Sequence, residues 1–421
     1  MMKYNIFREH FPDSILVYVE EKSKEAKELL IDFLDQKSFS NFLRFTNIET
    51  YSNGASMVLL KNYSLSKKWW FCENKFYSIK KSIIEKWAKE GQIESNFESA
   101  LIAFTIDLRD SLEEIFNSVH ISIKSLLNNI FPSLPNTNIK YLFSDYNNVS
   151  QISINIYDVG QGSWSDIKLN GKTRIVYDIG ADMDKAQTAV YGLFQSKSVD
   201  YASTNPVLIL SHWDKDHYHI LLTLSKAELQ TFSKFICRKA IIGITAQRIL
   251  NNMFNAIGRR NVFILPPEPA PTPKRAKTKI FPHKKPMDLT YLNLKNNKTD
   301  TILVFNSEKG GNSNTNTIVL TIQTSDKAIV LPADSHYDQV SVSLLPYLNY
   351  SHKHYLIVPH HGGNAGDYIY NLGPSVSIKD AIVSVGNNRY GHPIQKYIDK
   401  LQNQGFNIRR SDFEGDITIQ L

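Results

Sequence analysis

The sequence predicts an α/β domain over residues 149–421, preceded by an α+β domain over residues 1–148. In the second region, four short apolar runs each lead into aspartate or histidine, a pattern typical of buried strands that end in loops. In the first region, apolar residues at helical spacing flank strand-like segments. A chain of 421 residues is long enough to form two such cores.

The N-terminal module is predicted to contain helices over residues 21–44 and 97–131, because their apolar residues recur at helical spacing. Residues 56–60 and 68–77 are predicted strands. The second strand carries an aromatic cluster, which we interpret as core packing rather than as a platform that stacks nucleobases. Residues 132–138, rich in proline and asparagine, mark the domain boundary. The hypothesis for this module is that it binds a partner protein or a ligand.

One segment of the second region has the residue types of a metal site. The apolar run 207–210 predicts a short buried strand, and four side chains that suit a divalent cation follow it within six residues. His212 and Asp214 are two positions apart, so both project to the same side of an extended chain. Asp216 and His217 follow where the chain should turn. Taken alone, the segment has a second interpretation, a polar turn that binds no metal.

Three later segments repeat this pattern. Each is an apolar run followed by aspartate or histidine, with glycines that allow close approach of the backbone in two of them. The residues that follow the three strands are Asp334; His360, His361, Gly362 and Gly363; and Asn388, Arg389 and His392. Four strands with the same kind of ending predict a shared metal centre.

These segments form an ordered set of motifs. They are D-V-G-Q-G at 158–162, Asp178 with Gly180, H-x-D-x-D-H at 212–217, Asp334, H-H-G at 360–362, and S-V-G followed by R-Y-G-H-P between 384 and 393. In order and spacing the set resembles the metallo-β-lactamase-fold hydrolases. Within them it is most similar to the hydrolase domain of the ComEC family of competence DNA-uptake proteins. The resemblance covers roughly residues 150–421 and implies an αβ/βα sandwich of two mixed sheets.

The resemblance also implies a pair of divalent metal ions, zinc or manganese, with magnesium as an alternative. His212 and Asp214 would hold one ion and Asp216 and His217 the other, while Asp334 would bridge both. One of His360 and His361 would complete the set, and which of them does so stays open. Metal-pair members of the superfamily usually have histidine where Asp214 stands, and a carboxylate is a harder ligand that tolerates Mn²⁺ or Mg²⁺ better. No clear counterpart is found for the histidine that many members place between the metal loop and the bridging aspartate.

The implied reaction is hydrolysis by a metal-bridged hydroxide. Asp216, Asp334 and His392 are the predicted catalytic residues, with His392 either a ligand or the proton donor to the leaving oxygen. Asn388 and Arg389 are predicted to hold a phosphate of the substrate, since guanidinium binds phosphate through two hydrogen bonds. The backbone N–H groups of Gly362 and Gly363 are further predicted contacts with that phosphate.

An insertion over residues 266–298 separates the metal loop from Asp334. It begins with a proline run and continues with basic residues, Lys274 and Arg275 first. One interpretation is a basic arm that attracts a polyanion, and the other is a solvated loop. The net charge of +7 favours the arm mildly, and Lys274 and Arg275 are therefore predicted substrate-binding residues.

The favoured function is a phosphodiesterase or nuclease acting on nucleic acid. The alternatives are a hydrolase of a small phosphorylated or nucleotide substrate and a non-catalytic partner protein that keeps a metal site for structure. The only two cysteines, Cys72 and Cys237, indicate a reducing compartment rather than a disulfide framework. No apolar run reaches the roughly 18–20 residues of a membrane span, so we predict a cytoplasmic protein.

Overall fold

The structure is a computed structural model, and it divides the chain into two compact units. One is Met1–Ser133 with Ile241–Leu250, and the other is Leu134–Ala240 with Asn251–Leu421. The predicted boundary after residue 148 falls in a part of the chain outside the described residues. The structure describes residues 13–23, 28–46, 57–61, 76–89, 93–96, 101–105, 116–119, 149–239, 243–265, 287–291, 301–306, 316–345, 348, 352–366, 370, 372, 376–386, 388 and 390–421.

The described residues of the C-terminal unit form two seven-stranded sheets. In order across the first sheet, the strands are β13 (Val262–Leu265), β12 (Lys234–Arg238), β11 (Val207–Ile209), β10 (Lys172–Ile179), β9 (Trp164–Leu169), β8 (Ile152–Ile156) and β21 (Ile417–Gln420). Across the second sheet they are β14 (Met287–Tyr291), β15 (Thr301–Asn306), β16 (Ile318–Gln323), β17 (Lys327–Leu331), β18 (Lys353–Ile357), β19 (Ile378–Val383) and β20 (Asn407–Arg410).

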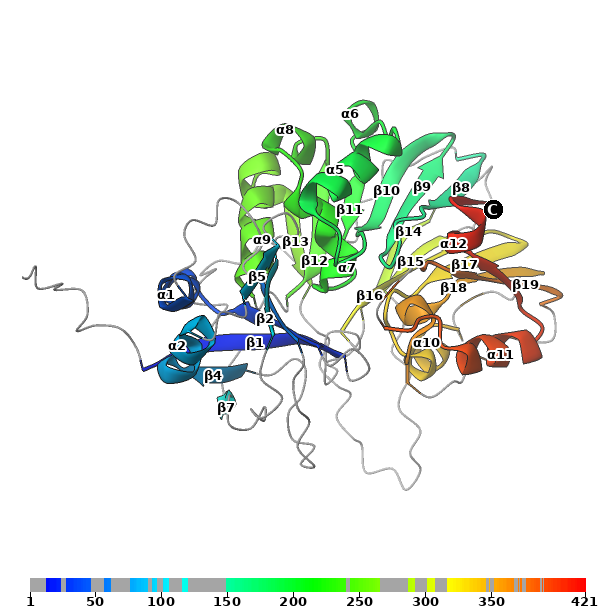
Figure 1. The fold of residues 1–421 in the computed structure, drawn as a ribbon. Helices are drawn as coiled ribbons and strands as arrows, with labels where there is room; N and C mark the ends of the chain where they lie inside the picture. Colours follow the sequence, from blue (N-terminus) through cyan, green and yellow to red (C-terminus); the bar gives the residue numbers. More distant parts are fainter. Residues whose placement is uncertain are drawn as a thin grey trace, which may run out of the picture. The chain divides into compact units, whose positions relative to one another are not determined.

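The core of this unit lies between the two sheets. Strand residues alternate between faces, so Ile329 and Leu331 of β17 join a cluster shared with the first sheet, while Val330 joins a second cluster on the outer face. The outer cluster includes Val340 of α10 (Tyr337–Ser343) and Leu401 of α11 (Gln395–Asn403), so both helices cover that face (Figure 1). Burial on both faces explains why these parallel strands read as continuous apolar runs.

Helices also cover the outer face of the first sheet. On α5 (Gln187–Ser196), Phe194 stacks on Trp164 of β9 at 5.9 Å between ring centroids, and Tyr201 of α6 (Tyr201–Thr204) accepts a hydrogen bond from Trp164 Nε1. Two facing sheets with helices outside confirm the predicted αβ/βα sandwich. No helix among the described residues is long and apolar enough to cross a membrane.

The direction of the strands fixes where the site lies. Strands β10 to β13 run parallel to one another, and so do β17 to β20. Parallel strands place their carboxyl ends along one edge of a sheet, where loops carry ligand-binding groups. The loops that follow β10, β11, β17, β18 and β19 therefore meet at one edge of the sandwich.

The N-terminal unit is built on a third seven-stranded sheet. Its strand order is β5 (Ile93–Asn96), β6 (Leu101–Thr105), β3 (Met57–Lys61), β2 (Glu28–Phe33), β1 (Ser14–Ser23), β4 (Phe76–Lys80) and β7 (Phe116–Val119). The helices α1 (Gln36–Thr46) and α2 (Lys81–Lys89) contribute Phe42 and Trp87 to its core. The start of α9 (Ile244–Ile257) also belongs to this unit, because Asp32 accepts a hydrogen bond from Thr245 N at 3.2 Å.

Two helix predictions for this unit are wrong over most of their described length. The range 21–44 contains the end of β1 and all of β2, and only its last part is helical. The range 97–131 contains β6 and β7. Strand β2 is buried on both faces, and short apolar runs of that kind fit a strand or a helix equally well. The strand predicted at 56–60 is confirmed as β3, whereas residues 68–75 lie outside the described part.

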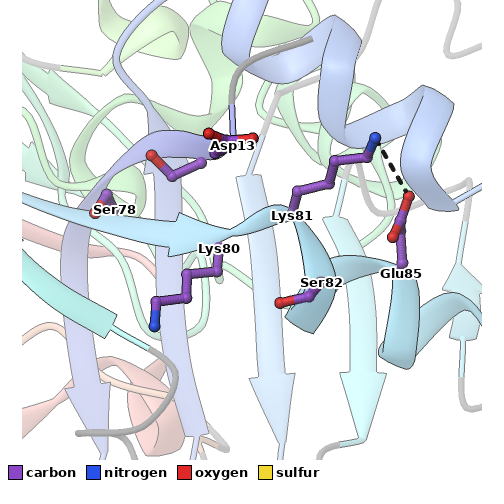
Figure 2. Close-up of a pocket in the computed structure, with 7 residues that line it drawn as sticks. Asp13, Ser78, Lys80, Lys81, Ser82 and Glu85 are labelled. Carbon is purple, nitrogen blue, oxygen red and sulfur yellow. Dashed lines mark ion pairs between the residues drawn. The ribbon is translucent and has the colours of Figure 1, made fainter. Parts of the chain in front are cut away.

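A polar groove of about 540 Å³ opens beside the start of α2 (Figure 2). Its wall carries an ion pair between Lys81 Nζ and Glu85 Oε1 at 3.6 Å, with both side chains partly exposed. Exposed pairs of this kind contribute at most about 1 kcal/mol. The predicted ligand-binding role of this unit stays a prediction. The groove is lined by Asp13, Ser14, Ser78, Lys80, Lys81, Ser82 and Glu85.

Candidate metal centre

The loop after β11 delivers four polar side chains to the carboxyl edge. His212 lies in the extended part, and the chain then turns into the short helix α7 (Lys215–Tyr218), which carries Asp216 and His217. Asp214 occupies the N-cap position of α7 without capping it, and its Oδ2 lies 3.2 Å from His212 Nε2 instead. His212, Asp216 and His217 are buried, whereas Asp214 is half-buried.

Asp334, just after β17, is the centre of the cluster. Its Oδ1 lies 3.1 Å from His217 Nε2, and its Oδ2 lies 3.7 Å from both His212 Nε2 and His360 Nε2. The two oxygens therefore face different histidines, as the predicted bridging role requires. These distances bring the loop after β11 together with Asp334.

His361 reaches the cluster from the other side, with its Nε2 3.1 Å from Asp216 Oδ2. The ligand atoms fall into two overlapping groups, His212–His217–Asp334 and Asp216–His217–His361. His217 belongs to both, although one imidazole nitrogen can hold only one metal ion. Both His360 and His361 lie within reach of the carboxylates, through Asp334 and Asp216 respectively.

Hydrogen bonds behind the cluster fix the histidine rings. Asp178 Oδ2 accepts from His217 Nδ1 at 2.8 Å and from Ser211 Oγ at 2.9 Å, while Ser211 Oγ accepts from His212 Nδ1 at 2.9 Å. One carboxylate thus orients both rings and directs their Nε2 atoms to the centre. On the other side, the Ser384 carbonyl accepts from His361 Nδ1 at 2.7 Å. Our sequence reasoning missed Ser211, whose only signal was a hydroxyl next to the first histidine.

Tight backbone contacts hold Asp216 in place. Ser163 N donates to Asp216 O at 3.0 Å, and a Cβ on Gly180 would lie 1.6 Å from that same oxygen. Only glycine fits there. His360 and His361 both have left-handed backbones, with φ of 51° and 52°, which non-glycine residues adopt at a cost in energy. The rest of the fold holds these strained positions, so the cluster is preorganised.

The electrostatics of the cluster are dominated by buried charge. Burial alone would raise the pKa of Asp216, but the positive charge of His217 and the nearby His361 ring lower that pKa to about 2. Burial likewise opposes the shift at His217, where the carboxylates of Asp334 and Asp178 raise the pKa well above its usual value. The pKa of Asp334 is likewise lowered, so Asp216 and Asp334 are ionised and stabilise positive charge at the centre.

The residues fit a divalent metal. His212 Nε2, His217 Nε2, Asp334 Oδ1 and His361 Nε2 are all buried and have no hydrogen-bond partner. Buried polar atoms normally have such partners, and buried charges are paired or bind metals. Imidazole nitrogen and carboxylate oxygen are the donors that zinc and manganese accept. The set can therefore bind divalent metal.

A buried lysine inside the metal loop is a feature that our sequence reasoning did not use. Lys215 stands between two predicted ligands and is fully buried, and its Nζ donates to Met183 O at 2.9 Å. His219 is also buried. Its Nδ1 makes a hydrogen bond to the backbone oxygen of Asp182, which lies next to Met183 in the loop after β10. These contacts tie the metal loop to the segment 181–185, so Lys215 and His219 have packing roles.

The predicted substrate-binding residues have other contacts in the structure. Asn388 bonds through its side chain to Gly386 O, His392 O, Tyr390 N and His392 N, which uses the full capacity of the amide to hold its own loop. Gly363 N donates to His360 O, and a Cβ on Gly363 would lie 2.5 Å from the ring of His392. These contacts give Asn388 and Gly363 structural roles, and their predicted substrate contacts stay predictions.

His392 lies at the rim of the cluster. Its ring centroid is 5.3 Å from that of His360, and its buried Nδ1 has no hydrogen-bond partner. Burial and the positive charges of His360 and His361 lower its pKa to about 3. Gly362 has φ of 79° and packs on Pro393, where a Cβ would lie 2.6 Å from the proline ring. Arg389, Lys274 and Arg275 lie outside the described residues.

No protein-family model and no curated protein matches the chain. Among solved structures, it is similar to the metallo-β-lactamase fold protein YhfI from Bacillus subtilis, at 10% identity and a TM-score of 0.36 over 64% of this chain and 100% of that one. It is also similar to the short form of human tRNase Z, at 10% identity and a TM-score of 0.35 over 63% and 98%. A third is a mutant of the β-hydroxylase CmlA, at 10% identity and a TM-score of 0.37 over 83% and 74%. At these values the three proteins say nothing of the reaction of this chain.

Proposed function

We propose that this protein is a metal-dependent hydrolase that cleaves phosphodiester bonds in nucleic acid. The observation that carries the proposal is the set of buried imidazole and carboxylate atoms without hydrogen-bond partners, gathered where two sheets present their carboxyl ends. The motif order, which resembles that of the ComEC hydrolase domain, supports phosphodiester hydrolysis as the reaction.

In this proposal, two divalent ions, zinc or manganese, are held by two sets of side chains. His212, Asp214 and His360 would hold one ion and Asp216, His217 and His361 the other, and Asp334, whose two oxygens face histidines of both sets, would contribute to each. Bound divalent ions supply Lewis-acid stabilisation of the charge that develops on the attacking and leaving oxygens.

The protein's own groups position the reaction. Asp178 and Ser211 hold two ligand rings, and Ser384 holds a third, so little reorganisation is needed when the substrate binds. His392, at the rim, is the proposed contact to the leaving oxygen. Arg389 and the basic residues Lys274 and Arg275 are proposed to hold phosphates of the substrate, which agrees with the net charge of +7.

A cleavage panel tests the proposal. Fluorescent single- and double-stranded DNA and RNA are incubated with the full chain and Mn²⁺, Mg²⁺ or Zn²⁺, at several salt concentrations. We expect cleavage that requires metal, with a KM that rises steeply with salt because a polyanion is bound. The variant His217→Ala should be inactive. Its matched control is His352→Ala, an exposed histidine next to the amino end of β18, which should remain active.

Two outcomes would contradict the proposal. Hydrolysis confined to small nucleotides, with a KM indifferent to salt, would favour the small-substrate alternative. Bound metal without cleavage of any phosphodiester, including bis(4-nitrophenyl) phosphate, would favour a non-catalytic partner protein.

A further inference from the structure

Phe413 is the most exposed large apolar side chain among the described residues. It is 78% exposed, and the only other large hydrophobic residue exposed in that part of the chain is Ile378, at 49%. Leaving a phenylalanine in water forgoes much of the stabilisation that burial provides. Phe413 lies on α12 (Ser411–Glu414), a single turn that follows β20. Exposure of Phe413 does not stabilise the fold, so we look for a binding role for this side chain.

The Phe413 ring is supported by a neighbouring cation. The Arg410 guanidinium carbon lies 4.3 Å from the centroid of the Phe413 ring, in cation–π contact. Arg410 is itself fixed by two hydrogen bonds to Asp412, at 2.9 Å from Nε and 2.6 Å from Nη2. A planar group that is fixed in advance loses little conformational entropy when it binds a partner.

Hydrogen bonds join the turn that carries Phe413 to the loop that holds His361. Ser411 Oγ accepts from Val385 N and donates to Val385 O, both at 2.9 Å. The neighbouring Ser384 carbonyl holds His361 at 2.7 Å. Because β20 runs parallel to β19, α12 follows the same carboxyl edge as the proposed ligands. Phe413 therefore lies on the rim of that edge.

The charges around the ring indicate what it can bind. Arg410 is paired with Asp412, and Arg409 is paired with Glu414 at 2.6 Å. The patch therefore has no surplus positive charge for a phosphate. An exposed aromatic face without such charge suits another flat aromatic group, and nucleobases stack on aromatic side chains regardless of sequence.

We propose that Phe413 is a stacking platform for one unpaired nucleobase of a single-stranded substrate whose phosphodiester lies at the metal centre. The inference rests on the proposed function and names part of its substrate, an unpaired base a short distance along the strand from the cleaved bond. Stacking on one aromatic residue corresponds to about a tenfold change in KM. Because no phosphate is neutralised here, that change is independent of salt.

The test uses the full chain and its variants Phe413→Ala and Phe413→Trp. The matched control is Ile378→Ala, an exposed apolar residue at the first position of β19, on the opposite edge of the sheet. The probes are a single-stranded oligonucleotide and a series in which one base at a time is replaced by an abasic site. We expect Phe413→Ala to raise KM about tenfold at low and high salt, Phe413→Trp to restore it, and Ile378→Ala to behave as the parent.

The abasic series separates stacking from a structural role. One abasic position should raise the KM of the parent, and parent and Phe413→Ala should then have equal KM values on that substrate. Equal KM values on the intact oligonucleotide would overturn the proposal. So would a loss of kcat in Phe413→Ala that is the same at every abasic position, since it would mean a damaged fold.

Binding is measured separately from cleavage. In the presence of Mn²⁺, an oligonucleotide carrying 2-aminopurine should be quenched by the parent and not by Phe413→Ala. If the parent does not quench the 2-aminopurine, the stacking proposal is wrong. If that same parent still hydrolyses bis(4-nitrophenyl) phosphate, the proposed hydrolase function is unaffected. A dimer in analytical ultracentrifugation that Phe413→Ala dissociates would identify the patch as a protein interface and also overturn the proposal.

Discussion

The two edges of the sandwich in the C-terminal unit carry opposite kinds of charge. At the amino ends of the parallel strands stand lysines, among them Lys172, Lys327 and Lys353, which are exposed or half-buried. Their ammonium groups contact water or acceptors at the surface. Lys353 Nζ, for example, lies 3.7 Å from Asp380 Oδ2. At the carboxyl ends stand carboxylates and imidazoles that are mostly buried, and inward-facing atoms among them, such as His212 Nε2 and Asp334 Oδ1, lack hydrogen-bond partners.

The difference shows that charge by itself does not mark a site. A lysine at a strand end keeps its hydration and needs no partner, so it contributes little to stability. A buried carboxylate that faces buried imidazole nitrogens has lost its water, and a cation can compensate that loss. The carboxyl edge is therefore the place where a metal ion gains most.

The largest effect is expected from a change at the centre of the carboxyl edge. Asp334→Asn keeps the shape of the side chain and removes the charge that faces three histidines. We expect phosphodiester hydrolysis to fall at least ~1000-fold, since several kcal/mol of transition-state stabilisation are lost. Asp380→Asn, at the lysine-bearing edge, is the control and should keep the rate of the parent. The comparison between the edges fails if both variants lose activity equally.

A second prediction concerns a buried carboxylate that does have hydrogen-bond partners. Asp166 of β9 accepts from Tyr157, Tyr201 and Thr173, and burial raises its pKa to about 6 from 3.8. A raised pKa means that the folded protein binds the proton more tightly than the unfolded chain does. The stabilisation is fully present below pH 3.8 and is lost as the pH rises to 6.

The measurement for Asp166 is the free energy of unfolding against pH. Relative to Asp166→Asn, which cannot ionise, the parent should lose about 3 kcal/mol between pH 3.8 and pH 6. Metal content should be the same in both proteins, because the Asp166 carboxylate is satisfied by hydroxyl groups. A difference that does not vary with pH would show that folding leaves the pKa of Asp166 unchanged.

A smaller effect is expected behind the ligands. Asp178→Asn leaves the predicted ligands in place and weakens the acceptor that orients His217 at 2.8 Å. We expect metal affinity to fall by about 10- to 100-fold, with activity recovered when excess metal is added. Titration with Mn²⁺ measures both quantities. Activity that stays low at saturating metal would instead give Asp178 a direct part in the reaction.

Much of the carboxyl edge could be predicted from the sequence, because its signals are local. The run Lys327–Leu331 reads as a strand that leads into a carboxylate, and it folds as β17 with Asp334 close behind. His212 and Asp214 lie two apart and meet as expected, at 3.2 Å. The sequence could not predict which carboxylate lies against which histidine. The contact of Asp216 with His361 depends on the packing of two sheets whose strands are far apart in the sequence.

The N-terminal unit was harder to predict for a physical reason. Leu29, Ile31 and Phe33 of β2 are all buried, and so are the residues between them, so the strand has no polar face to give a period of two. The apolar residues of the range 21–44 also recur at helical spacing, which suggested a single long helix. The part of α9 that belongs to this unit is residues 244–250, far along the chain, and no local pattern indicates it.

The most direct test of the metal centre is the metal content of the purified full chain. After loading with Mn²⁺ or Zn²⁺ and removal of free ions, elemental analysis should give up to two ions per chain in the parent. His217→Ala or Asp216→Ala should lose at least one ion, whereas Lys353→Met, at the opposite edge, should keep the parental number. A parent that retains no divalent ion, or variants that retain as many ions as the parent, would contradict the account.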